Sequence, residues 1–397
     1  MNKDTLLVSA GRDKKYTGAA VNPSIARAST IVFDSMADMA AAGRQKSYRF
    51  DTENSTSEYY GRRGTSTTFA FNDAMCELEN AEGSYVYPCG TAAITTCLLA
   101  FLSAGDHLLM VDSVYEPTRD FCHGTLARMG IEVSYYDPMA GGDIQTLVKG
   151  NTRVIFLESP GSLTMEVQDL PSIVAVAKQY GIVTMIDNTF ASPFNFKPLN
   201  FGIDISIHSA TKYLNGHSDV MLGVASANKQ CWSQLSDRSY ELGQCASVDD
   251  IYTTLRGIRT LGVRMREHER NAMAVATWLE QHDLVDRLLH PAFDSCPGHE
   301  FFMRDFSGGN GLFSFVLKQS NGKAITAMVD NMRHFKMGFS WGGYESLILP
   351  VGAAPAARSV APWSLQRRLI RLHIGLENTQ DLIADLSDGL DRLQEAL

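Results

Sequence analysis

Short apolar runs alternate with helical patterns along the middle of the chain, from residue 66 to residue 258. The apolar runs predict strands at residues 85–87, 107–111, 133–136, 154–157, 182–186, 203–207 and 221–225. The segments between them predict helices at residues 69–78, 92–102, 117–129 and 170–180. Because strand and helix repeat in this way, we expect an α/β fold with a mostly parallel sheet covered on both faces.

The regions on either side of this repeat have other patterns. The first 65 residues are rich in Arg, Ser, Thr, Asn and Tyr without a sustained period, which predicts an extended N-terminal arm. After residue 259 a charged helical pattern precedes a mixed region, which predicts a smaller α/β domain. The elements expected there are a helix at residues 264–282, strands at 312–317, 347–349 and 369–373, and a closing helix at 379–393.

This reading divides the chain into three parts. They are an arm over residues 1–65, a large domain over 66–258 and a small domain over 259–397. Within the small domain, residues 351–362 are rich in Ala and Pro and predict a mobile loop.

Composition and charge narrow the classes of function. Apolar residues make up 45% and charged residues 20%, which is ordinary for a globular enzyme. The formal net charge is -9 without a basic run, so nucleic acid and anionic membrane are poor partners. The apolar stretches are too short and too interrupted to span a bilayer, and the first residues lack a signal-peptide pattern. The seven cysteines form no C-x-x-C pair, so we expect reduced thiols in a cytoplasm and no metal site.

Several residues that could bind a ligand or take part in catalysis lie at the ends of predicted strands or directly after them. In an open parallel sheet, ligands bind at this edge. Gly90 and Thr91 stand at a strand-to-helix junction, which is either a phosphate cradle or a plain turn with a Thr cap. Asp187 ends a later strand, where its carboxylate either pairs with a protonated pyridine nitrogen or caps the next turn.

Lys212 directly follows another predicted strand, within Ser209-Ala210-Thr211-Lys212-Tyr213. Its amine is a candidate for a Schiff base, and the hydroxyls of Ser209 and Thr211 are candidate phosphate ligands. Taken alone, a surface lysine after a strand is the simpler interpretation. Together with Asp187 and Gly90, however, Lys212 supplies what pyridoxal 5'-phosphate (PLP) chemistry requires.

Eight motifs give the chain a family resemblance over nearly its whole length. In order they are Tyr60-Gly61-Arg62, Pro88-Cys89-Gly90, Tyr115-Glu116-Pro117, Glu158-Ser159-Pro160, Asp187-Asn188-Thr189, Ser209-Ala210-Thr211-Lys212-Tyr213, Gly216-His217-Ser218-Asp219 and Arg371-Leu372-His373-Ile374-Gly375. In these motifs the chain resembles the PLP-dependent enzymes of cysteine and methionine metabolism, the transsulfuration family. The resemblance implies an aspartate aminotransferase-like, fold-type I structure with PLP as the cofactor.

The resemblance also implies how the cofactor is held. Lys212 would attach it covalently, Asp187 would pair with its pyridine nitrogen, and Tyr115 would stack on its ring. The residues implied to bind its phosphate are Gly90, Thr91, Ser209 and Thr211. For Tyr115 alone, an aromatic residue at a helix start is the simpler interpretation.

On the substrate side, Arg371 would clamp the carboxylate, and Ser340 and Trp341 would line the same pocket. For Arg371 alone, an ion pair at the edge of the core is the simpler interpretation. Tyr60 and Arg62 would reach the phosphate in the neighbouring subunit. The implied assembly is a homo-oligomer, typically a tetramer built as a dimer of dimers.

Two segments resemble the β-lyases of the family, namely Ser340-Trp341-Gly342-Gly343-Tyr344-Glu345-Ser346 and Glu158-Ser159-Pro160-Gly161-Ser162. The related γ-synthases and γ-lyases usually carry a small aliphatic residue where Trp341 stands. The implied reaction is PLP-dependent β-elimination of L-cystathionine, and of related cysteine S-conjugates, to homocysteine or another thiol, pyruvate and ammonia in methionine biosynthesis. Lys212 would act as the base at Cα, with Tyr115 as a second catalytic residue.

Other functions remain open at this point. A cystathionine γ-lyase, a γ-synthase or a methionine γ-lyase would share every cofactor residue and differ in acting at Cγ. A non-catalytic regulatory protein that has kept the fold is a further alternative, which the presence of Lys212, Asp187 and Arg371 disfavours. A nicotinamide dehydrogenase is weaker still, because no G-x-G-x-x-G follows an early strand.

Overall fold

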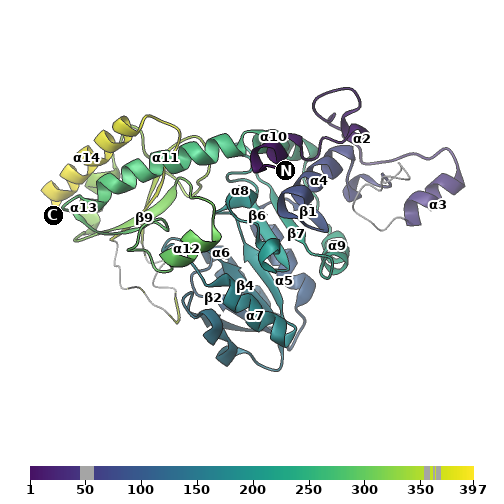
Figure 1. The fold of residues 1–397 in the computed structure, drawn as a ribbon, viewed down its shortest axis with the longest axis horizontal. Coiled ribbons are helices and arrows are strands. Elements are labelled where there is room, and N and C mark those ends of the chain that lie inside the picture. The colour runs from purple at the N-terminus through teal and green to yellow at the C-terminus, as the bar shows by residue number, and fades with distance from the viewer. Residues whose placement is uncertain (45–57, 353–357, 361–362, 364–367) are drawn as a thin grey trace.

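A computed structural model describes residues 1–44, 58–352, 358–360, 363 and 368–397 of the chain (Figure 1). The larger of its two sheets has seven strands, in the order β1-β7-β6-β5-β4-β2-β3. They are β1 (Gly83–Tyr87), β2 (His107–Val111), β3 (Glu132–Tyr136), β4 (Thr152–Glu158), β5 (Val183–Asp187), β6 (Ile205–Ser209) and β7 (Gly223–Ala227). Only β7 runs antiparallel to its neighbours, so the predicted mostly parallel sheet is confirmed.

Helices cover both faces of the large sheet, because its strands are apolar on both faces. Along β7, Val224 belongs to a core shared with α4 (Ser66–Glu79), whereas Ala225 and Ala227 belong to a core shared with α5 (Gly90–Phe101). The other helical segments of this region are α6 (Glu116–Phe121), the π-helical turn Cys122–Leu126, Gly141–Leu147 (3₁₀), α7 (Leu170–Tyr180), α8 (Ser192–Asn195), Pro198–Phe201 (3₁₀), α9 (Trp232–Glu241) and α10 (Val248–Arg259).

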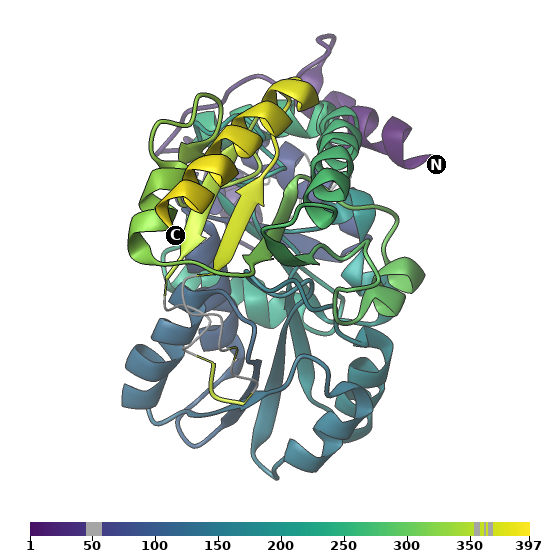
Figure 2. The same cartoon turned by 90° about the vertical axis from the view of Figure 1, so that its left-hand side faces the viewer.

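The second sheet has five strands, in the order β10-β11-β12-β9-β8. They are β8 (Val285–Leu289), β9 (Leu312–Leu317), β10 (Lys336–Met337), β11 (Leu347–Val351) and β12 (Leu369–His373). All pairs are antiparallel except β10 with β11. The helices of this region are α11 (Leu261–Glu280), α12 (His299–Asp305), α13 (Gly322–Val329) and α14 (Thr379–Ala396). Figure 2 shows α14 lying along this sheet.

The long helix α11 connects the two parts of the molecule (Figure 1). Its first turns place Leu261 and Met265 in the core beneath the large sheet. Its later turns place Val275 and Leu279 in a separate core with strands of the second sheet. One continuous helix therefore fixes the second sheet relative to the first.

The strand predictions agree with the structure at all ten predicted positions, with ends displaced by at most two residues. The prediction missed β8 and the two-residue β10, whose polar residues hide the apolar pattern. Most of the loop predicted at residues 351–362 lies outside the described residues.

The N-terminal region differs from the extended arm that was expected. It contains α1 (Lys3–Ser9), α2 (Lys14–Thr17), α3 (Met36–Arg44) and the 3₁₀ turn Gly61–Arg63. Asn2 caps α1, and Leu7 packs in the core with Leu261. A helix of seven residues has too few turns to show a detectable hydrophobic period. The sequence pattern therefore did not predict α1, which its Asn2 cap and one buried leucine stabilise.

Two further observations concern the described residues as a whole. Among them, no helix has both the length and the apolar character needed to cross a membrane. All seven cysteines are free thiols, of which only Cys245 is exposed.

Candidate active site

The ends of β5 and β6 bring Asp187 and Ser209 to one edge of the large sheet. The strands are adjacent and parallel, with Asp187 in register with Ile207. Thr189 bridges the two ends: its hydroxyl donates to Asp187 Oδ1 at 2.5 Å and accepts from the Ser209 amide at 2.8 Å. The Thr189 amide also donates to Asp187 Oδ1, at 3.0 Å. Burial raises the pKa of Asp187, and the bonds from Thr189 oppose that rise.

The N-terminus of α5 lies directly against Ser209. A Cβ built on Gly90 would fall 2.6 Å from Ser209 Cβ, so only glycine permits this approach. The helix is capped by the Cys89 thiol, which accepts from the Ala92 amide at 3.4 Å, and not by Thr91. Gly90 and half-buried Thr91 thus stand beside Ser209 at a helix N-terminus, the arrangement that favours an anion.

The loop after β6 carries Thr211 and Lys212. The Thr211 hydroxyl accepts from the Leu222 amide at 3.0 Å, which closes the loop onto the chain before β7. The Lys212 amine donates to Ser340 Oγ at 2.8 Å and lies 5.4 Å from the centroid of the Trp341 ring. Burial and, to a lesser extent, the charge of Arg371 lower the pKa of Lys212 to about 8, against the opposing charge of Asp187.

Arg371 and Ser340 reach this site from the second sheet. Arg371, on β12, donates from Nη2 to the carbonyls of Phe339 at 3.0 Å and Ser340 at 3.2 Å. Burial lowers the pKa of Arg371 to about 10. Gly342 has a left-handed φ of 87°, and a Cβ there would lie 2.9 Å from the carbonyl carbon of Lys212. The backbone at Gly342 therefore rests directly on the lysine loop.

Tyr115 begins α6 on the same side of the large sheet. Its amide donates to Glu158 Oε2 at 2.8 Å, and the residue is 44% exposed. Burial raises the pKa of the Tyr115 phenol, the carboxylates of Asp187 and Glu158 raise it further, and Arg371 opposes them. Tyr115 is thus close enough to Asp187 and Arg371 for their charges to act on it.

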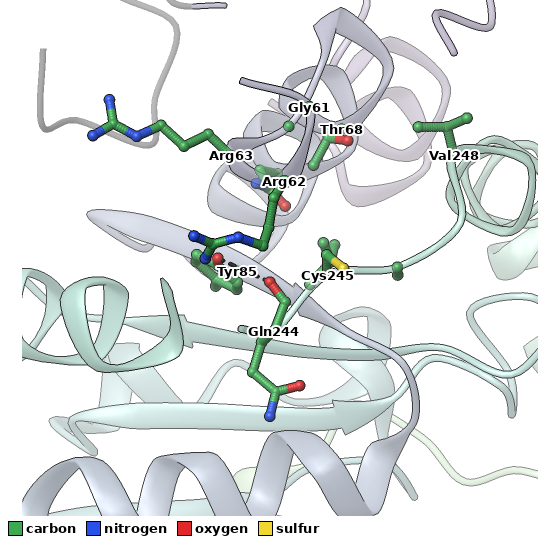
Figure 3. Close-up of a pocket in the computed structure, with 12 residues that line it drawn as sticks. Gly61, Arg62, Arg63, Thr68, Tyr85, Gln244, Cys245 and Val248 are labelled. Atoms are coloured by element: carbon green, nitrogen blue, oxygen red, sulfur yellow. Dashed lines mark hydrogen bonds between the residues drawn. The ribbon is translucent and has the colours of Figure 1, made fainter. Parts of the chain in front are cut away.

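Two predicted site residues lie elsewhere in the chain. Arg62 donates to the Tyr240 carbonyl at 2.7 Å, and its guanidinium lies 3.9 Å from the centroid of the Tyr240 ring. Tyr60 precedes it and is 46% exposed. Figure 3 shows Arg62 in a pocket with Tyr85 and Gln244, residues outside the Lys212 site. Within one chain, Tyr60 and Arg62 are thus not part of the group around Lys212.

Comparison with known proteins assigns the chain to a family. Residues 4–391 match the family model described as Cys/Met metabolism PLP-dependent enzyme. The chain belongs to this family of PLP-dependent enzymes. It is 49% identical over 396 residues to the cystathionine beta-lyase MetC of Escherichia coli, and 47% identical over 395 residues to a cystathionine beta-lyase of Haemophilus influenzae. Each alignment covers 98% of both proteins.

The solved structures support the same family through the fold. A cystathionine gamma synthase from Xanthomonas oryzae pv. oryzae superposes with a TM-score of 0.89 at 32% identity, covering 100% of both chains. The predicted fold-type I architecture is therefore confirmed. Because a γ-synthase shares this fold, the fold alone does not distinguish β- from γ-chemistry.

The residues present fit the PLP that members of this family use. The approach of Gly90 to Ser209 leaves backbone amides and a hydroxyl together for a phosphate. Asp187, whose pKa burial raises, would be stabilised as a carboxylate by a cationic ring nitrogen. Lys212 supplies a partly buried amine with a pKa near 8, which suits covalent attachment.

Sequence reasoning missed two residues of this family site. Thr189 belongs to the motif Asp187-Asn188-Thr189. A hydroxyl two residues after an aspartate often bonds to that carboxylate, and this spacing could have indicated its role. Glu158 stood within Glu158-Ser159-Pro160, but no pattern in the sequence indicated that its carboxylate accepts from the Tyr115 amide.

Proposed function

We propose that this protein is a PLP-dependent carbon–sulfur lyase that cleaves L-cystathionine by β-elimination. The products are homocysteine, pyruvate and ammonia, and related cysteine S-conjugates would release their own thiols. The observation that carries this proposal is the near-full-length similarity, at 47–49% identity, to enzymes named cystathionine beta-lyase. Trp341 beside the Lys212 amine supports it, since γ-acting members usually carry a small aliphatic residue there.

The cofactor would be held at the edge of the large sheet. Lys212 would attach it, Asp187 would pair with its ring nitrogen, and Tyr115 would stack on its ring. Gly90, Thr91, Ser209 and Thr211 would bind its phosphate. The close contact of Gly90 with Ser209 and the bridge through Thr189 support this assignment.

When bound, PLP would supply an electron sink that acidifies the Cα proton of the substrate. The Lys212 amine would serve as the base, and its pKa of about 8 leaves roughly a tenth of it unprotonated at pH 7, a few hundred times more than for an ordinary lysine. We assign to Lys212 the transfer of the Cα proton, which allows the β-carbon to release its thiolate. The Ser340 hydroxyl, 2.8 Å from the amine, would orient it toward Cα. Tyr115 would act as a second catalytic residue.

Arg371 would bind the substrate carboxylate. Its guanidinium contacts only backbone carbonyls of residues 338–340 within the described chain, and a carboxylate is a stronger acceptor for its planar fork. Such a clamp would fix Cα within reach of Lys212.

Product analysis tests the proposed reaction. The purified holoenzyme would be incubated with L-cystathionine, and the released 2-oxo acid identified by mass spectrometry. Pyruvate with homocysteine is the expected result. Release of 2-oxobutanoate with cysteine would assign γ-elimination instead, and a colourless protein that binds no PLP would favour a regulatory role.

We further propose that Tyr60 and Arg62 complete the active site of a neighbouring subunit, in a homo-oligomer such as a dimer of dimers. Tyr60 is 46% exposed, and Arg62 lies against Tyr240 and not beside Lys212 within its own chain. Complementation tests this arrangement: Lys212→Ala and Arg62→Ala would each be inactive, and their mixed oligomers would recover activity. Mixed oligomers that stay inactive would contradict a shared site.

A cytoplasmic location is also proposed. It rests on the seven cysteines, all of which are free thiols in the structure. Fractionation of cells that produce the tagged protein would test it, and recovery from an oxidising compartment would contradict it.

A further inference from the structure

Strand β12 presents two polar side chains to the segment that carries Ser340. Arg371 and His373 are alternate residues of one strand, so they point to the same face of the sheet. Arg371 donates to the carbonyls of residues 338–340, and His373 Nε2 contacts the Gly343 carbonyl at 3.0 Å. Ser340, Trp341 and Gly342 are therefore held between two anchors on β12.

His373 is fixed in its position and in its protonation state. It is 1% exposed and packs with Tyr213 and His268, whose ring centroids lie 5.8 Å and 5.2 Å from its own. Burial lowers the pKa of His373 to about 3, so the imidazole is neutral. Since the Gly343 carbonyl can only accept, Nε2 carries the hydrogen and donates it.

The anchored segment contacts the lysine loop directly. Gly342 rests on the backbone of Lys212 and Tyr213, with room for no side chain. Tyr213 packs against Trp341 at 5.5 Å between ring centroids, and its hydroxyl accepts from the Gly311 amide at 3.0 Å. Movement of the Gly343 carbonyl would thus displace Gly342 from Lys212 and shift Ser340 relative to the amine.

We propose that His373 is a positioning residue for the lysine base, acting through residues 340–343 to hold the Ser340 hydroxyl against the Lys212 amine. His373 touches neither Lys212 nor the proposed substrate. Its effect on turnover rests on the proposed function, whereas its effect on the order of the 338–345 segment does not.

Two isosteric substitutions separate positioning from simple packing. Glutamine places its amide nitrogen near the position of Nε2, whereas the amide nitrogen of asparagine falls near Nδ1 and cannot reach the Gly343 carbonyl. Hydrogen–deuterium exchange of the holoenzyme would be followed in peptides covering residues 338–345. We expect His373→Asn to speed exchange there about tenfold, which corresponds to the loss of one hydrogen bond. His373→Gln should retain most of the protection seen in the wild type.

Steady-state kinetics with L-cystathionine provide the second measurement. His373→Asn should lower kcat about tenfold with a smaller change in KM, because the base and not the carboxylate clamp is displaced. Combined with Ser340→Ala, it should add little to the loss from Ser340→Ala alone, because His373 acts through Ser340. Thermal unfolding would establish that each variant is folded.

His290 offers a matched control. It is another buried histidine, its pKa is also lowered by burial, to about 4, and it packs against Phe293 and Phe313 away from Lys212. His290→Asn should leave exchange at 338–345 and kcat unchanged.

Three outcomes would overturn the proposal: equal effects of asparagine and glutamine at position 373, unchanged exchange in His373→Asn, or full additivity with Ser340→Ala. If the wild-type holoenzyme does not cleave L-cystathionine, the proposed function fails. The exchange comparison would still decide the role of His373.

Discussion

The candidate site has two halves that are built in different ways. The cofactor-side group consists of Asp187, Thr189, Ser209 and Lys212, which lie at the ends of two adjacent parallel strands or directly after them. The substrate-side segment, residues 338–343, has little regular structure and is held through its carbonyls by side chains of the other sheet. Strand register brings the ends of β5 and β6 together in the first half, where the hydroxyls of Thr189 and Thr211 hold the following loops, whereas the second half depends on side-chain contacts throughout. The halves meet at the bond between Lys212 and Ser340.

Removing Lys212 should abolish the function of both halves and gives the largest expected effect. Lys212→Ala should lower turnover of L-cystathionine by at least about a thousandfold, because it removes the proposed base, and should eliminate the absorbance of the lysine-linked cofactor. Lys197→Ala is the control, since Lys197 is also partly buried with a lowered pKa. A Lys212→Ala protein that keeps a borohydride-reducible cofactor linkage would disprove the assignment.

Arg371→Ala should damage the substrate side while leaving the cofactor side intact. Loss of a charge-assisted bidentate pair should raise KM by about 10- to 100-fold, with cofactor affinity little changed. Kinetics and absorbance titration with PLP would measure the two effects, and Arg368→Ala, which removes an arginine just before β12 that donates to the Lys318 carbonyl, is the control. Loss of cofactor with an unchanged KM would indicate a structural role for Arg371.

Thr189→Val should weaken cofactor binding and leave substrate binding nearly unchanged, the reverse of Arg371→Ala. It removes the side-chain bonds to Asp187 and Ser209 with little change of shape, so the pKa of Asp187 should rise further. We expect cofactor affinity to fall about tenfold and KM to change little. At the other end of β5, Thr184 makes a comparable bond to Asp204, at 2.9 Å, so Thr184→Val is a matched control. Equal losses from both variants would mean that Thr189 matters only for stability.

The smallest expected effect is on the pKa of the Lys212 amine, which charges from both halves of the site influence. In the cofactor-free protein, labelling of Lys212 by an amine-reactive reagent should rise with pH and reach half its maximum near pH 8, because only the unprotonated amine reacts. Arg371→Ala should move this midpoint upward, because a neighbouring positive charge that disfavours the ammonium is lost. Asp187→Asn should move it downward. At pH 8 each change in labelling rate should be less than about tenfold. Shifts in the same direction would contradict the charge assignment.

Sequence patterns predicted that Asp187, Ser209 and Lys212 lie at one edge of the sheet, for a physical reason; their roles toward a cofactor stay predictions. Parallel strands end at a common edge, so locating β5 and β6 is enough to bring Asp187, Ser209 and Lys212 together. Gly90, which precedes a predicted helix, likewise indicated a position where another segment packs closely against the backbone, and Ser209 occupies that position. Thr189 was missed because its partners are set by the turn after β5, whose geometry the sequence pattern does not specify.

The substrate side was predicted only through resemblance. Ser340 and Trp341 follow no periodic element, and their place beside Lys212 depends on two sheets being joined through α11. His373 was quoted within a motif, but nothing in the pattern connects it with a carbonyl 30 residues earlier. The predicted roles of Tyr60 and Arg62 require a second copy of the chain and stay predictions.

The left-handed Gly342 has a practical consequence for redesign of this protein. Libraries that aim at other thioethers could randomise Trp341, whose ring lies beside the Lys212 amine, and keep Ser340, which accepts a hydrogen bond from that amine. Position 342 should be kept constant in such libraries, because any Cβ would collide with the lysine loop. Keeping this glycine would limit screening to variants in which the lysine loop can still adopt its position in the site.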